Sequence, residues 1–203
     1  MTLAHNMFIR GLNSIYLQAP HIAAAEHHNF AQYMRRWSTI VRLHYQAEEV
    51  DFFTAIEALS GVESIMEGNI AQHHAFEPGL DAFHAHVEAV LAGTEDVLVA
   101  HLADGIPTLE GLRPHADKLE PFVEEGHGRG GAELDELGLS GMVWAFAHID
   151  LEFGDGMWAN WPAASAVVRF LATSLFWRIH GGMAKFKAVD KSGHMRHLYA
   201  VLK

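Results

Sequence analysis

The stretch "IVRLHYQAEEVDFF" at residues 40–53 decides the fold, because it combines a helical apolar pattern with two polar groups. Val41 and Phe52 continue an apolar stripe that begins at Trp37, and His44 and Glu48 lie one turn apart on the same face. A stripe facing a protein core normally excludes such groups, because burying them without partners is costly. The pair therefore raises the question of whether other helices supply partners for it.

The rest of the chain has helical patterns and no convincing alternating strand. Thr2 can cap a first helix, Pro20 and Gly61 interrupt the chain, and Pro78 should bend the third helix. The predicted helices run over about 2–18, 23–59, 63–91 and from Thr94 to about 112. Short connections favour an all-α, antiparallel four-helix bundle over residues 1–112. Residues 113–203 are predicted to add C-terminal helices that pack on the bundle, giving one compact unit.

Each predicted bundle helix carries a histidine or a carboxylate along its inward stripe. These candidate metal ligands are His5 on the first helix, His44 and Glu48 on the second, His73 and Glu77 on the third, and His101 and Asp104 on the fourth. Imidazole nitrogens and carboxylate oxygens together suit iron, manganese or zinc, and carboxylates can bridge two ions. One such pair is weak evidence. Two pairs in phase with apolar neighbours predict a metal site, whereas His74 and His84 are expected outside it.

The order of these residues resembles that of the hemerythrin-like, or HHE cation-binding, proteins. The similar segments are "AHNMFIRGLNSIYLQAP" (4–20), "HYQAEEVDFF" (44–53), "GNIAQHHAFEPGL" (68–80) and the tail "LEFGDGMWANWP" (151–162). The resemblance implies a four-helix bundle around a non-heme di-iron centre that meets dioxygen. Carried over by position, it implies the ligands His5, His44, Glu48, His73, Glu77 and His101.

Two positions depart from the family pattern. Glu77 stands where the oxygen-carrying members have a second histidine, and Gly105 in "HLADGIPTL" replaces a carboxylate. Three accounts of the second departure are open: Asp104 could substitute, Glu77 could bridge, or one iron could keep open coordination positions. An open position beside a cavity favours dioxygen activation over reversible carriage.

Two classes of function follow. The first is a di-iron oxygenase or oxidase that uses dioxygen to oxidise a small organic substrate. The second is a non-catalytic carrier, sensor or store of dioxygen or iron. The sequence contains no glycine-rich nucleotide-binding motif, so an enzyme of this kind would take electrons from a partner or from its substrate. Manganese or zinc could replace the two iron ions.

Composition narrows the expected partners and location. A formal net charge of −11 disfavours nucleic acid, since binding a phosphate backbone needs lysine and arginine. There are no cysteines, and the opening "MTLAHNMFIRGLNSI" looks like a helix rather than a secretory leader, which favours a cytoplasmic protein. The segment "AVVRFLATSLFWRI" (166–179) is too short for stable membrane insertion and contains Arg169. An oligomer is possible.

Overall fold

The computed structural model describes residues 2–93 and 143–201, apart from residues 158, 162, 163, 176, 177, 179 and 180. This part of the chain is mostly helical and contains no strand, only an isolated antiparallel bridge between Val189 and Met195. The all-α prediction is therefore confirmed for these residues. The expected fourth bundle helix lies outside them.

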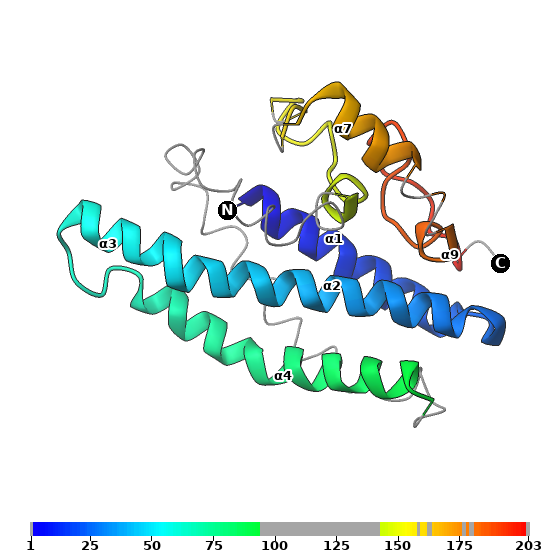
Figure 1. The fold of residues 1–203 in the computed structure, drawn as a ribbon, viewed down its shortest axis with the longest axis horizontal. Coiled ribbons are helices and arrows are strands. Elements are labelled where there is room, and N and C mark those ends of the chain that lie inside the picture. The colour runs from blue at the N-terminus through cyan, green and yellow to red at the C-terminus, as the bar shows by residue number, and fades with distance from the viewer. Residues whose placement is uncertain are drawn as a thin grey trace.

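Three long helices lie side by side (Figure 1): α1 (Thr2–Gln18), α2 (His27–Ala47) and α4 (Glu67–Leu91). Figure 1 shows α2 and α4 running in opposite directions. The observed bounds of α1 are those predicted from the sequence. Among the described helices, none combines the length and the apolar character needed to cross a bilayer.

The predicted second helix is built from several pieces. A short 3₁₀ turn at Ala24–Glu26 precedes α2, and a π-helical turn, η3 (Glu48–Phe53), joins α2 to α3 (Thr54–Ser60). Gly61 then ends α3 with a φ of +67°, a left-handed conformation that glycine adopts at little cost. The helix break predicted at this glycine is confirmed.

The third predicted helix begins later than expected, at Glu67 rather than near residue 63. Ser64, with a φ of 59°, lies in the loop that occupies the difference. Pro78 lies inside α4 and cannot donate a hydrogen bond to the His74 carbonyl. The ribbon of α4 changes direction part-way along its length (Figure 1).

The π-helical turn shifts the buried stripe by one residue. The sequence pattern predicts Phe52 as the next core residue after Glu48, but Phe53 is buried and Phe52 is partly exposed. A π-helical turn accommodates one residue more than an α-helical turn, so the inward position moves from i+4 to i+5. On α4, Phe76 occupies the buried position between His73 and Leu80 that the sequence stripe gave to Glu77.

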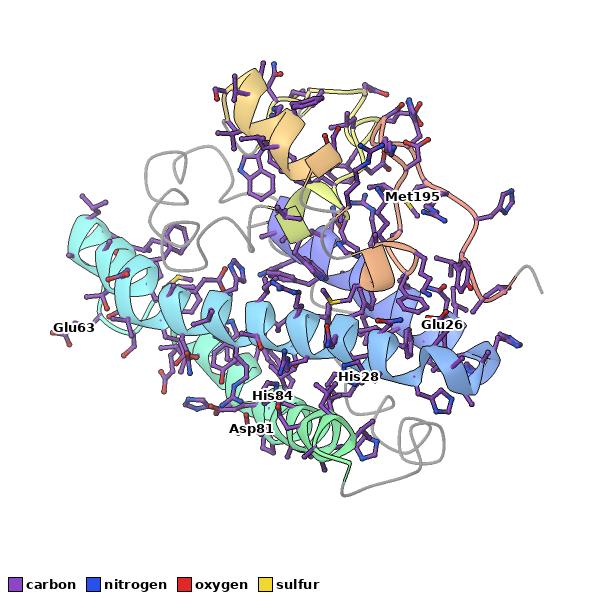
Figure 2. The ribbon with its side chains drawn as sticks, turned by 45° about the vertical axis from the view of Figure 1, so that its right-hand side comes forward. Glu26, His28, Glu63, Asp81, His84 and Met195 are labelled. Atoms are coloured by element: carbon purple, nitrogen blue, oxygen red, sulfur yellow. The ribbon has the colours of Figure 1, made fainter. Side chains whose placement is uncertain are left out.

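Polar contacts join α2 to α4 beside the buried stripe. The Arg42 guanidinium lies 3.3 Å from the Asp81 carboxylate, and the Ser38 hydroxyl lies 2.8 Å from His84 Nδ1. Figure 2 shows Asp81 and His84 near each other along α4. These contacts hold together the two helices that carry His44, His73 and Glu77.

The C-terminal part packs against α1 and the start of α2. It contains α7 (Ala166–Phe170), a π-helical turn at Leu171–Leu175 and α9 (Gly181–Ala184). The Phe186 carbonyl accepts hydrogen bonds from Ser14 Oγ and Gln18 Nε2, both on α1. Lys185 pairs with Glu26, which lies next to the C-terminal segments in Figure 2. The hydrophobic core runs from α1, α2 and α4 into residues 143–200.

Gly11 lets α1 approach two buried indole rings closely. A Cβ at this position would lie 2.6 Å from Trp144 Cη2 and 2.7 Å from Trp37 Cδ1. We expect Gly11→Ala to lower the free energy of unfolding by about 1–3 kcal/mol, because overpacking outweighs the better helix propensity of alanine. Urea unfolding measures the change. Gly68→Ala is the matched control, since a Cβ there meets nothing within 4 Å, and an unfolding midpoint equal to wild type for Gly11→Ala would contradict the prediction.

Candidate metal site

The Glu48 carboxylate lies between three imidazoles contributed by three helices. Glu48 is 2% exposed. Its Oε1 lies 2.9 Å from His44 Nε2 and 3.5 Å from His5 Nε2, and its Oε2 lies 3.3 Å from His73 Nε2. His5, His44 and Glu48 each offer one ligand atom, and these atoms all lie within 4.8 Å of one another. A metal ion could therefore contact all three side chains.

The Glu48 carboxylate is placed to receive a cation. Both buried oxygens of Glu48 lack a hydrogen-bond partner with suitable geometry among the described residues. His73 Nδ1 lies 2.8 Å from Glu49 Oε1, and because an ionised carboxylate can only accept, Nδ1 carries the proton. In neutral His73, the Nε2 lone pair then faces Glu48 Oε2. Two acceptors in this position require a cation between them, either a proton or a metal ion, so the residues fit a metal.

Glu49 belongs to the candidate site, and the sequence reasoning missed it. A regular helix places adjacent residues about 100° apart, so Glu49 was not expected to share a face with Glu48. Both residues begin the π-helical turn η3, and both carboxylates reach His73. π-Helical turns inside helices occur often at functional sites, but no feature of the sequence marks this one. Glu49 orients His73, as carboxylate partners of metal-binding histidines do.

Electrostatics favour an ionised Glu48. Burial by itself raises the pKa of Glu48, but the opposing effects of His44, His5 and His73 together hold that pKa well below its usual range. The pKa of His5 is lowered, chiefly by burial and against the attraction of Glu48. An ionised carboxylate is the form of Glu48 that binds a metal ion.

Among the described residues, aromatic rings pack against these ligands. Phe8 contacts the ring of His44 at 4.9 Å between centroids, and Phe53 stacks on His73 at 5.5 Å. Phe76 packs edge-on against His73 at 5.6 Å. These apolar contacts fix the imidazole planes and exclude water from this side of the site, which strengthens charge interactions within it.

The sequence-predicted ligands fall into three groups. His5, His44 and His73 come together around the Glu48 carboxylate. Glu77 is partly buried, and its Oε1 accepts a hydrogen bond of 3.0 Å from the Tyr45 hydroxyl, which helps to raise the pKa of Tyr45 to about 12 after the larger effect of burial. The positions His101, Asp104 and Gly105 lie outside the described residues.

We expect Glu49→Gln to weaken iron binding by roughly 10- to 100-fold, the usual effect of losing a partner that orients a metal-binding histidine. A glutamine amide can either donate to or accept from His73 Nδ1, so the variant no longer fixes the tautomer. Competition with a chelator measures the affinity. Asp51→Asn is the control, because Asp51 is exposed in the same π-helical turn. Equal affinities for Glu49→Gln and wild type would contradict the orienting role.

Comparisons with known proteins give one distant relative. No protein-family model matches the chain, and no solved structure matches it significantly. The chain is 28% identical over 217 residues to a protein of Cryptosporiopsis sp. (strain 8999) named "Dimeric xanthone biosynthesis cluster protein R11". The matched region covers 98% of this chain and 80% of that protein, so the similarity extends over almost the whole chain.

Proposed function

We propose that this chain is a hemerythrin-like, non-heme di-iron protein that binds dioxygen and uses it to oxidise a small organic molecule. The observation that carries the proposal is the buried Glu48 carboxylate facing His5, His44 and His73. The antiparallel four-helix bundle is part of the same proposal, with the fourth helix supplying His101 and Asp104. Glu77 would complete the set from α4.

The residues of the site have separable roles. His5, His44, Glu48 and His73 would hold iron, and Glu49 keeps the proton of His73 on Nδ1 so that Nε2 faces the metal. The rings of Phe8, Phe53 and Phe76 keep water away from the imidazoles. Bound ferrous iron would supply the electrons that reduce dioxygen and the oxidising power that acts on the substrate.

The substrate class proposed here is a hydroxylated aromatic compound. Its support is the name of the relative, which places that protein in a dimeric xanthone biosynthesis cluster. Electron-rich phenols lose electrons readily and could themselves supply reducing equivalents. A separate reductase partner would then not be required for turnover.

The test begins with anaerobic ferrous loading, followed by metal analysis and an absorption spectrum under air. Dioxygen consumption is then measured with a hydroxylated xanthone and with a simple hydroquinone. We expect close to two iron ions per chain and repeated turnover of at least one phenol. His73→Ala should abolish both results, whereas His74→Ala, which changes the exposed neighbouring histidine, should leave both unchanged.

Two outcomes would overturn the proposal in different ways. Iron content near zero after anaerobic loading would remove the metal site itself. Iron binding with a reversible dioxygen adduct and no turnover of either phenol would replace the oxygenase with the alternative function, a non-catalytic carrier, sensor or store.

A further inference from the structure

A second buried polar group lies in the C-terminal part of the core. His148 is completely buried, and its Nε2 lies 2.6 Å from the Tyr33 hydroxyl. Its Nδ1 lies 2.8 Å from the Trp144 carbonyl oxygen, which can only accept. Nδ1 therefore carries the proton, and the Tyr33 hydroxyl donates to the lone pair of Nε2. The phenol has a base placed at hydrogen-bond distance.

Aromatic rings connect this pair to the candidate metal site. Phe8 lies 4.9 Å from His44 and 6.2 Å from Trp144, between ring centroids. Trp144 stacks on His148 at 3.9 Å, with an angle of 21° between the ring planes. The rings thus run without interruption from a metal ligand, through Phe8 and Trp144, to His148 and the Tyr33 hydroxyl.

The same series of aromatic rings continues from Tyr33 toward the surface. Phe186 lies 6.0 Å from Tyr33 and 5.8 Å from Tyr199, between ring centroids. Tyr199 is partly exposed, whereas Tyr33 and Phe186 are buried. An electron donor in solution could therefore reach the outer end of the series at Tyr199.

We propose that Tyr33 and His148 form a proton-coupled redox pair, which takes up oxidising equivalents from the candidate metal site through Trp144. In this step Tyr33 loses one electron, by way of Trp144, to an oxidised iron centre, which is reduced by one electron. The phenolic proton moves at the same time to His148 Nε2, leaving a neutral tyrosyl radical and an imidazolium. An external one-electron donor such as a thiol or ascorbate then reduces the radical, and the proton returns to the phenolate oxygen.

The geometry explains why the oxidising equivalent would rest on Tyr33 rather than on Trp144. The Trp144 indole N–H has no hydrogen-bond acceptor among the described residues, so its oxidised form has no base to take the proton. Tyr33 has such a base. Burial raises the pKa of Tyr33 and lowers that of His148 to about 3, so the proton stays on the phenol until oxidation makes it a far stronger acid.

The pair can be tested without iron, which keeps this inference separate from the proposed function on which its iron-dependent step rests. Metal-free protein is oxidised with photogenerated ruthenium(III) tris-bipyridine, and electron paramagnetic resonance follows the radical. We expect a neutral tyrosyl radical whose yield falls several-fold in Tyr33→Phe, which keeps the ring. Tyr16→Phe is the control, because Tyr16 is exposed on α1. Equal yields in wild type and Tyr33→Phe would overturn the proposal.

The role of His148 has its own readout. His148→Gln keeps a hydrogen-bond acceptor near Tyr33 but cannot take up the proton, so the lifetime of the radical should fall several-fold. In wild type, formation of the radical should slow in deuterated solvent, a measurement that needs no variant to fold. A lifetime unchanged in His148→Gln, or formation unaffected by deuterium, would overturn the coupling to a proton.

The role of Trp144 is tested in iron-loaded protein exposed to air. Trp144→Phe should lower the yield of the Tyr33 radical several-fold at equal iron content, while the yield with the soluble oxidant stays as in wild type. A yield unchanged in both experiments would overturn the route through Trp144. If the protein takes up no iron, the proposed function fails, and the metal-free experiment still decides whether Tyr33 and His148 form a redox pair.

Discussion

Glu48→Gln should lower the affinity for iron by at least ~100-fold and leave little metal bound after gel filtration. Losing a residue that only orients a metal ligand already lowers metal affinity by about 10- to 100-fold. Among the described residues, Glu48 is the one carboxylate that faces His5, His44 and His73 together. Glutamine has nearly the same shape but no charge, so the loss reports on ligand charge rather than on packing. Metal analysis after anaerobic ferrous loading measures the effect.

The same variant separates a metal site from a purely structural ion cluster. Without metal, Glu48→Gln replaces the buried carboxylate by a neutral amide of nearly the same shape. The unfolding free energy of the metal-free protein should therefore change less than the free energy of iron binding. Glu67→Gln is the matched control, because Glu67 is exposed at the start of α4. Iron content equal to wild type in Glu48→Gln would show that metal, if bound, is held elsewhere.

Helical periodicity was sufficient to predict that α1, α2 and α4 form, but not the internal register of the second predicted helix. The breaks at Pro20 and Gly61 follow from local backbone chemistry, so the bounds of α1 and the end of α3 could be predicted. The π-helical turn η3 could not be predicted, because its single additional residue produces no compositional signal. Phe53 therefore replaces Phe52 in the core as a consequence of tertiary packing.

The candidate site was predictable wherever polar residues kept the phase of an apolar stripe. His44 and Glu48 met this condition, and the structure brings His5 and His73 to the same carboxylate. Glu49 did not meet it, because its approach to His73 depends on η3. Tyr33 and His148 are 115 residues apart, and no periodicity within either segment could indicate their contact.

Acidification should destabilise the metal-free protein through His148, beginning well above the range in which carboxylates titrate. Burial lowers the pKa of His148 from 6.5 to about 3, with smaller contributions from Lys187 and Arg10 in the same direction and an opposing one from its bond to Trp144. The unfolded chain therefore binds a proton at this position below about pH 6.5 that the folded chain does not bind. Stability contributed by neutral His148 is fully present above pH 6.5 and is lost as the pH falls toward 3.

The size of this effect follows from the pKa difference, since each pKa unit corresponds to about 1.4 kcal/mol. The cost of charging His148 in the folded protein is then about 5 kcal/mol, a large fraction of the 5–15 kcal/mol that is roughly typical of whole domains. Urea unfolding between pH 7.5 and pH 4, roughly the interval around the ordinary histidine pKa, measures how the free energy of unfolding changes with pH. His148→Gln has no ionisable group at this position, so its unfolding free energy should depend less on pH, whereas the exposed-site variant His74→Gln should retain the wild-type slope. If the unfolding free energy of His148→Gln depends on pH as steeply as that of wild type, other groups cause the acid sensitivity. Glu48 and His5 at the candidate metal site would be the first of these to examine.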